Sequence, residues 1–250
     1  MQNNMQTNQS FDNEFLAQPD LFAAAAAADE RAGFIMKTYM YLLGAIAAFI
    51  AIETCLFSVV GTPKLMELTA ATLGKGGLPW LVVLGAFMIV SWIASAWASS
   101  DTNPVMQHAG LGIYVLANSL IFVPLLCMAQ AVGGSGTILS AATATAGLFA
   151  LLTLTVFITR KDFSFLRASL TFGGLAALGF IIAAIVFGFA LGPIFCYAMI
   201  ALMCGYILYD TSNILHHYRI GQHVAAALAL FASVVMLFWY ILRLFILREE

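Results

Sequence analysis

The chain alternates long apolar stretches with short polar or glycine-rich breaks. Seven stretches approach or exceed about 20 residues, the length that a helix needs to cross roughly 30 Å of hydrocarbon. A membrane β-barrel would instead show alternating segments of about ten residues. The pattern therefore predicts an all-α polytopic membrane protein, a bundle of seven transmembrane helices at residues 38–60, 78–98, 109–132, 137–158, 171–191, 193–212 and 222–245.

The breaks contain residues that end helices. Asp101-Thr-Asn-Pro104 separates the second and third predicted helices, and Gly133-Gly-Ser-Gly136 separates the third and fourth. Gly192-Pro193 leaves so short a link that the fifth and sixth helices must run antiparallel, with proline in the first turn of the sixth. Gly188 and Gly192 are spaced to give the fifth helix a small-residue surface for close packing.

The first 30 residues differ from the rest of the chain. They are polar at first and then include an alanine run from Ala23 to Ala28. Such a segment has too little apolar surface to form a core of its own. We predict a flexible tail at residues 1–30, followed by a transmembrane domain at residues 31–250.

Composition agrees with the apolar pattern. Hydrophobic residues make up 62% of the chain and charged residues 9%, with a mean hydropathy of +0.97, whereas a soluble domain is about a quarter charged. A net charge of −2 gives no reason to expect a nucleic-acid partner. In the predicted topology, six basic residues lie on the same side of the membrane as the N-terminus and four lie on the opposite side. Because Lys and Arg are enriched in cytoplasmic connections, the N-terminus is predicted to be cytoplasmic. The six are Arg31, Lys37, Arg160, Lys161, Arg167 and Arg219, and the four are Lys64, Lys75, Arg243 and Arg248.

An acidic residue, Asp210, closes the sixth apolar stretch. A charged side chain inside a bilayer costs about 2.5–3.5 kcal/mol on insertion scales, so an acid there suggests a function. Steps of four, three and four place Tyr206, Asp210, Asn213 and His217 on one helix face, which could hold a proton or a hard cation such as Ca²⁺. The alternative is that Asp210 caps the helix or pairs with Arg219 or a histidine at the water boundary.

Other polar side chains are weaker candidates. Glu53 lies within the first stretch and is predicted to face the protein interior, or else to sit near the outer interface. His216, His217 and His223 share one short loop, but no cysteine or acidic pattern completes a zinc site. No cofactor is expected, apart from calcium as a transported ion with Asp210 as its ligand.

Ser135 stands in a glycine-serine loop similar to that of rhomboid intramembrane proteases. A serine nucleophile needs a base within hydrogen-bond reach. The candidate histidines, His216 and His217, fall on the opposite side of the predicted bilayer. We therefore expect that the protein is not an enzyme.

Three segments resemble the Bax inhibitor-1 family, a group that includes bacterial modulators of a membrane-bound protease. The resemblance covers roughly residues 31–246, nearly the whole membrane region. The segments are Arg31-Ala-Gly-Phe34-Ile-Met-Lys37-Thr38-Tyr39, Ile207-Leu-Tyr209-Asp210-Thr211-Ser212, and Ala226-Ala-Leu228-Ala-Leu230-Phe231 with the following Leu237-Phe238-Trp-Tyr-Ile-Leu242-Arg243.

The resemblance implies a location in the bacterial inner membrane, and a seven-helix bundle around a central hydrophobic seventh helix. It also implies a pH-sensitive calcium leak in which aspartates on helices six and seven share a proton. Asp210 matches the first position and Ser233 the second, so the second carboxylate is missing. The arginine with which helix two closes the family's pore is missing too, because residues 76–159 contain no Lys or Arg.

These departures weaken the expected calcium binding, because a divalent cation would lose half of its charged ligands. Glu53 or His217 are the candidates to replace the missing acid. Two functions follow from the residues and the resemblance together. The first is a pH-sensitive cation or calcium leak gated near Asp210. The alternative is a non-conducting regulator of a membrane-bound protease or another membrane complex.

Overall fold

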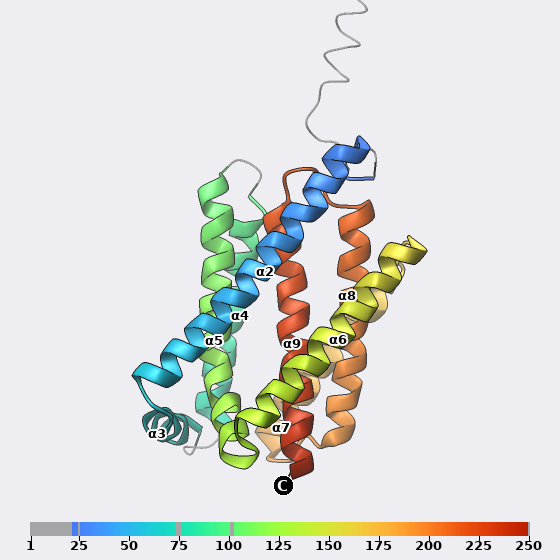
Figure 1. The fold of residues 1–250 in the computed structure, drawn as a ribbon. Helices are drawn as coiled ribbons and strands as arrows, with labels where there is room; N and C mark the ends of the chain where they lie inside the picture. Colours follow the sequence, from blue (N-terminus) through green and yellow to red (C-terminus); the bar gives the residue numbers. More distant parts are fainter. Residues whose placement is uncertain (1–21, 25, 74–76, 101–102, 250) are drawn as a thin grey trace, which may run out of the picture.

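The computed structural model describes residues 22–24, 26–73, 77–100 and 103–249, and these residues form eight helices (Figure 1). Seven are long and apolar enough to cross a membrane, which confirms the predicted all-α polytopic architecture. The spanning helices are α2 (Ala28–Val59), α4 (Gly77–Ala98), α5 (Pro104–Val132), α6 (Gly134–Thr159), α7 (Leu166–Phe187), α8 (Pro193–His216) and α9 (His223–Glu249).

Several helix boundaries differ from the predicted ones, and three of the differences change the description of the fold. Helix α2 begins at Ala28, ten residues early, because the alanine-rich segment continues into it without a helix breaker. A short helix, α3 (Thr62–Leu73), replaces the predicted loop, with Pro63 tolerated in its first turn and Leu65 buried. Of the predicted tail, residues 1–21 lie outside the described residues.

The third difference concerns the end of α7. This helix ends at Phe187, and Gly188 follows it in a left-handed conformation with φ +72°, a common way for glycine to end a helix. Gly192 comes after the link and precedes α8. The prediction that both glycines form a packing surface on the fifth helix was therefore wrong.

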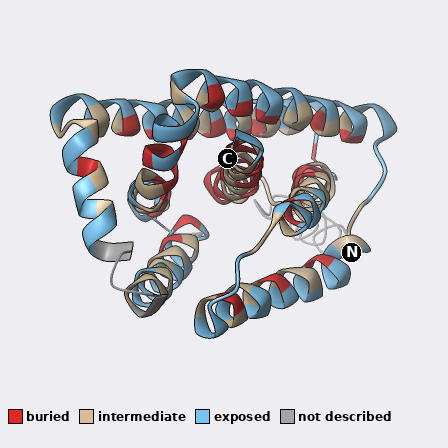
Figure 2. Cartoon of the chain, turned by 90° about the horizontal axis from the view of Figure 1, so that it is seen from below, coloured by how far each residue is buried: buried red, intermediate tan, exposed pale blue. Residues whose placement is uncertain are grey.

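Helix α9 is the centre of the bundle. It packs against α2, α4, α5, α6 and α8, and it has the largest buried share of the seven spans. Figure 2 looks along the bundle and shows α9 surrounded by the other helices, with buried residues around its circumference. This arrangement agrees with the central seventh helix that the family resemblance implies.

An aromatic cluster joins α2, α5 and α9 inside the bundle. Phe122 of α5 is 1% exposed. Its ring meets Phe49 and Trp239 edge-on, at centroid distances of 5.1 and 4.9 Å, and stacks on Phe238 at 5.8 Å. Lipid tails are as apolar as these rings, so the contacts stabilise the bundle by close packing rather than by removal of water.

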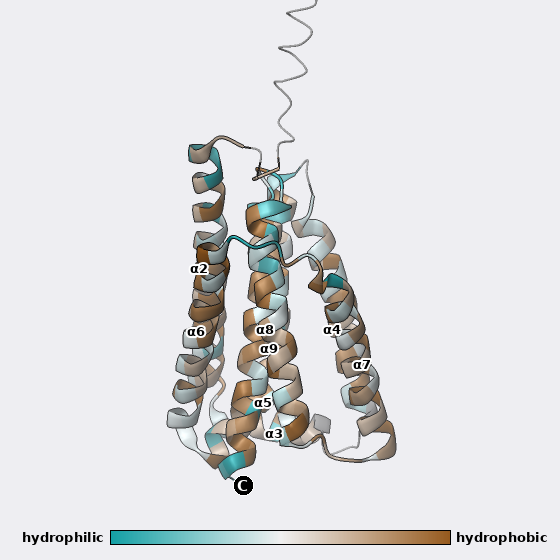
Figure 3. Ribbon diagram, turned by 90° about the vertical axis from the view of Figure 1, so that its right-hand side faces the viewer, coloured by the Kyte–Doolittle hydropathy of each residue, from teal (hydrophilic) through white to brown (hydrophobic). Residues whose placement is uncertain are grey.

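The polar residues gather at the two ends of the bundle (Figure 3). The start of α2 and the α4–α5, α6–α7 and α8–α9 connections lie together at one end, which we call the upper end as drawn in Figure 1. Helix α3, the α5–α6 turn and the end of α9 lie at the lower end. The apolar middle matches the hydrocarbon layer of a bilayer.

Candidate functional site

Asp210 meets Ser233 inside the bundle, where α8 and α9 run antiparallel. Both side chains are buried, with exposed fractions of 8% and 6%. The Ser233 hydroxyl donates a hydrogen bond of 2.6 Å to Oδ2 of Asp210. Bonds of 2.5–2.7 Å between a hydroxyl and a carboxylate are typical of strong, charge-assisted contacts. The structure thus brings together the two residues that the family resemblance pairs.

Three buried hydroxyl groups on α2, α6 and α8 lie close to one another. Tyr39 of α2 directs its phenol towards Thr153 of α6 and Thr211 of α8. Within the described residues, none of the three hydroxyls has a partner at hydrogen-bond geometry. Buried polar groups usually have one. Thr211 directly follows Asp210 in α8, so this polar cluster includes the residue next to the acid in the chain. Sequence analysis missed the cluster, although Tyr39 and Thr211 both lie in segments that carry the family resemblance.

The other predicted members of the α8 face have different partners. The Tyr206 phenol donates to the backbone oxygen of Leu170 in α7 at 3.0 Å. Asn213 is half-buried in the last turns of α8. His217 follows α8 and lies 3.6 Å from a carboxylate oxygen of Asp162, in the α6–α7 connection. The four side chains share a face, but they do not converge on one ion.

The α6–α7 connection is fastened to the end of α8. Phe163 donates its backbone N–H to Ser212 Oγ at 2.9 Å, and Asp162 accepts one from Ser164 at 2.8 Å. That Ser164 bond and the nearby His217 hold the pKa of the Asp162 carboxyl below its usual value. Sequence analysis did not single out Asp162 or Ser212, because nothing in the sequence places the two segments together.

The segment before α2 crosses the same end. Ala23 donates its N–H to the backbone oxygen of Tyr218 at 2.8 Å, and Phe22 pairs with Arg219 in an antiparallel bridge. Burial raises the pKa of the Tyr218 phenol, and the nearby Asp210 carboxylate raises it further. Residues 22–23 and the α6–α7 connection therefore cover the upper end of the bundle, above Asp210.

Glu53 lies in the other half of the molecule. It is 7% exposed and sits in the lower part of α2, near Cys127 of α5. Among the described residues, neither of its carboxylate oxygens has a hydrogen-bond partner. Because Asp210 lies near the upper end of the antiparallel α8, the structure does not bring the two acids together.

The histidines do not form a metal centre. His216 and His217 have ring centroids 6.3 Å apart, while the His223 ring lies tilted against Tyr41 at a centroid distance of 5.0 Å. In the described part of the chain, no three His, Cys, Asp or Glu side chains gather closely enough to hold a metal ion. The site's chemistry is therefore that of one carboxylate, the Ser233 hydroxyl and neighbouring hydroxyls.

Seven apolar helices, with the buried α9 at their centre, define a multi-pass α-helical integral membrane protein. The family model described as "Inhibitor of apoptosis-promoting Bax1" matches residues 31–250, so the chain belongs to the Bax inhibitor-1 family. It is similar to the Arabidopsis thaliana proteins LIFEGUARD 3 and LIFEGUARD 4. The first is 32% identical over 219 residues, 85% of this chain and 83% of that protein. The second is 31% identical over 223 residues, 86% and 85% of the two chains.

A bacterial relative is also similar. An uncharacterized protein of Pseudomonas aeruginosa is 28% identical over 160 residues, which cover 64% of this chain and 68% of that protein.

Proposed function

We propose that this protein is a pH-sensitive cation leak gated at the Asp210–Ser233 contact, with Ca²⁺ as the ion to test first. The supporting observation is the 2.6 Å hydrogen bond that joins α8 to the central α9 through a buried carboxylate. Acidic residues inside membrane spans commonly mark ion or proton pathways. Family membership is consistent with such a role.

A proton changes the chemistry of this contact. An ionised Asp210 can only accept a hydrogen bond, whereas the protonated acid also has a hydroxyl to donate. Protonation therefore alters the bond that holds α8 against α9, and a cation competes with the proton for the same oxygen atoms. The α6–α7 connection and residues 22–23 cover this end, so a change in α8 would reach them through Ser212 and Tyr218.

The test is calcium flux from liposomes that contain the purified protein and trapped Ca²⁺. We expect faster release than from empty liposomes, with a rate that differs between acidic and neutral pH. Asp210→Asn should remove that pH dependence, while Glu67→Gln, an exposed acid on α3, should keep it. Equal release from the wild type, Asp210→Asn and empty liposomes would exclude conduction.

We further propose that the protein lies in a bacterial inner membrane, with its upper end in the cytoplasm. This proposal rests on the six basic residues that sequence analysis assigned to the cytoplasmic side, since Lys and Arg are enriched in cytoplasmic connections.

A non-conducting regulator is the second candidate. The observation in its favour is Ser233, a neutral hydroxyl where the family's second carboxylate is expected. A regulator of a membrane-bound protease should co-purify with that protease from native membranes in mild detergent. Co-purification together with an absence of flux would favour this function over the leak.

A further inference from the structure

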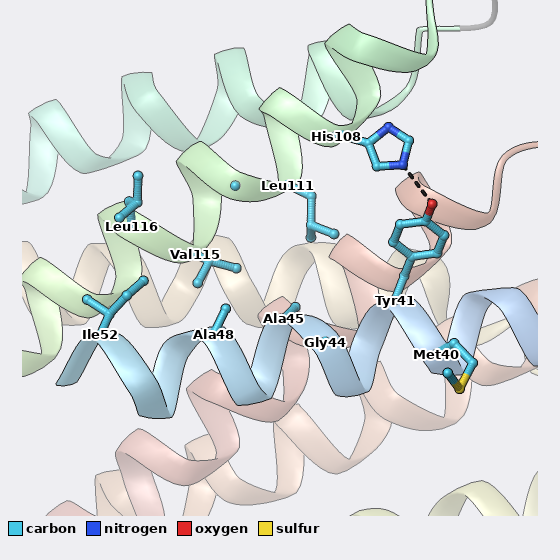
Figure 4. A pocket seen from close by; sticks show the side chains of 11 residues that line it. Met40, Tyr41, Gly44, Ala45, Ala48, Ile52, His108, Leu111, Val115 and Leu116 are labelled. Atoms are coloured by element: carbon cyan, nitrogen blue, oxygen red, sulfur yellow. Dashed lines mark hydrogen bonds between the residues drawn. The ribbon is translucent and has the colours of Figure 1, made fainter. Parts of the chain in front are cut away.

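A lateral groove runs between α2 and α5, away from the Asp210 site (Figure 4). Its volume is about 540 Å³, within the roughly 300–1,000 Å³ typical of ligand sites. One wall comes from α2 and the other from α5, and nearly all the lining atoms are apolar. The wall residues are Met40, Gly44, Ala45, Ala48 and Ile52 on α2, and Leu111, Gly112, Val115 and Leu116 on α5.

Two glycines keep the groove open without serving helix packing. A Cβ atom built on Gly44 or on Gly112 would meet no heavy atom within 4 Å. Gly110, two residues before Gly112 and on another face of α5, is different, because its Cβ would lie 2.5 Å from the backbone oxygen of Ala94. Both Gly44 and Gly112 are exposed, so the groove opens sideways towards the lipid.

The upper end of the groove is polar. The Tyr41 hydroxyl and His108 Nε2 are 2.7 Å apart across the two walls, as the dashed line in Figure 4 marks. Lys37 lies one helical turn before Tyr41 and is exposed. The His223 ring contacts the Tyr41 ring in a tilted arrangement at a centroid distance of 5.0 Å, and it lies near both Lys37 and His108. A lysine and two histidine rings thus stand at the upper end of the groove.

The groove has the length of one leaflet. It runs from Met40 to Ile52, which at 1.5 Å per residue is about 18 Å along α2. One leaflet contributes about half of the roughly 30 Å hydrocarbon layer. Helix α2 is inclined in Figure 1, so the depth of the groove along the membrane normal is smaller than its length along α2. The inclination brings this depth closer to the thickness of one leaflet.

We propose that this groove binds one glycerophospholipid of the surrounding leaflet. One of its two acyl chains lies between α2 and α5, and its phosphate lies at the upper end beside Lys37, Tyr41 and His108. Charge and depth together favour this occupant. Basic groups at the surface attract an anionic headgroup, and the apolar part of the groove ends about one leaflet deep. A transmembrane helix from a second copy would have no need for the basic end.

Native mass spectrometry of the full chain with added phosphatidylglycerol tests this site. We expect one phosphatidylglycerol to stay bound at detergent concentrations that strip other lipids. Gly112→Leu and Gly44→Leu fill the groove from opposite walls and should each reduce that bound fraction several-fold. The matched control is Gly179→Leu on α7, which is also exposed and has open space around its Cβ position.

The headgroup is tested with diacylglycerol of the same chains, which lacks the phosphate. The wild type should retain phosphatidylglycerol in preference to diacylglycerol. Lys37→Gln should weaken phosphatidylglycerol retention about fivefold, which corresponds to the ~1 kcal/mol that one basic residue contributes at an anionic surface. Equal retention of the two lipids by the wild type would overturn the phosphate contact.

Two outcomes would overturn the groove itself. Unchanged lipid retention in both leucine variants would mean that the bound lipid lies elsewhere on the surface. A dimer that both variants disrupt, without a retained lipid, would assign the groove to a second copy. Each variant is compared with the wild type only if its circular dichroism and unfolding temperature match, and Gly44→Leu and Gly112→Leu serve as independent replicates.

Discussion

Ser233 gives Asp210 a neutral hydrogen-bond donor at a position where a second acid would compete for the same proton. The hydroxyl can satisfy the carboxylate in either protonation state, since it both donates and accepts. The contact between Asp210 and Ser233 therefore persists without a shared proton. A pair of adjacent carboxylates would need such a proton to stay in contact. In the proposed leak, the response to pH therefore rests on the proton of Asp210 rather than on a pair of acids.

Replacement of Ser233 by aspartate tests this view. The new carboxylate would face Asp210 at the position of the present 2.6 Å contact. Two such groups cannot both ionise without a large electrostatic cost, so they should hold one proton between them. We expect Ser233→Asp to make calcium release from liposomes more strongly pH-dependent, while the neutral Ser233→Asn does not. Identical pH profiles for Ser233→Asp and wild type would contradict this role of Ser233.

Asp162 allows a pH prediction for stability. Its pKa is lowered in the folded protein from an ordinary value of 3.8. Folding therefore favours its ionised form, and this stabilisation is present above that value and is lost as the pH falls through the lower folded pKa. Asp162→Asn should lower the free energy of unfolding at neutral pH by less than about 1 kcal/mol, because the contact is exposed.

Thermal unfolding in detergent measures this effect, with the exposed Asp29→Asn of α2 as the control. The difference between Asp162→Asn and wild type should shrink as the pH falls below 3.8 and disappear once the pH is below the lowered pKa of the folded protein. A difference that increases on acidification would show that Asp162 does not act as an ionised acceptor.

The helices of this bundle differ in how closely they approach one another. Helices α4 and α5 come close at Gly110, whereas α2 and α5 diverge around Gly44 and Gly112 to leave the lateral groove. Asn103 fixes the start of α5 by accepting bonds from the backbone N–H groups of Val105 and Met106. The same helix thus has a tightly packed face towards α4 and an open face towards the lipid.

The close approach predicts a cost for one added methyl group. Gly110→Ala would place a Cβ 2.5 Å from the backbone oxygen of Ala94 and 2.7 Å from the backbone nitrogen of Ala98. Backbone atoms cannot rotate away, so α4 and α5 must separate, at about 1–3 kcal/mol. Gly112→Ala, on the open face, should unfold at or above the wild-type temperature. Equal unfolding temperatures for the two variants would contradict the described α4–α5 packing.

Across the whole molecule, sequence analysis predicted the seven spans and the pairing of Asp210 with Ser233, because length, hydropathy and one signature segment carry that information. It could not predict which way His217 or Tyr206 would turn. Spanning helices are apolar on all sides, so periodicity does not report the rotation of each helix about its axis. It also missed α3 and the lateral groove, since both depend on how neighbouring helices diverge.

An odd number of spans places the two chain ends on opposite sides of the membrane. We expect a cysteine added at the N-terminus of a cysteine-free variant to resist an impermeant thiol reagent in intact cells, and one added at the C-terminus to react. The natural bias of Lys and Arg towards the cytoplasm is the reason. The reverse labelling pattern would invert the proposed orientation, and labelling at both ends would contradict seven spans.

The central claim is that the protonation of Asp210 controls the leak. Infrared difference spectra of the reconstituted protein, recorded across a pH series and compared with Asp210→Asn, isolate the carboxyl C=O absorption of this residue. Calcium release from the same preparation gives the pH dependence of the leak. We predict that the two titrations share one midpoint. A carboxyl that titrates at a different pH from the flux, or a flux that follows pH equally well in Asp210→Asn, would contradict the account.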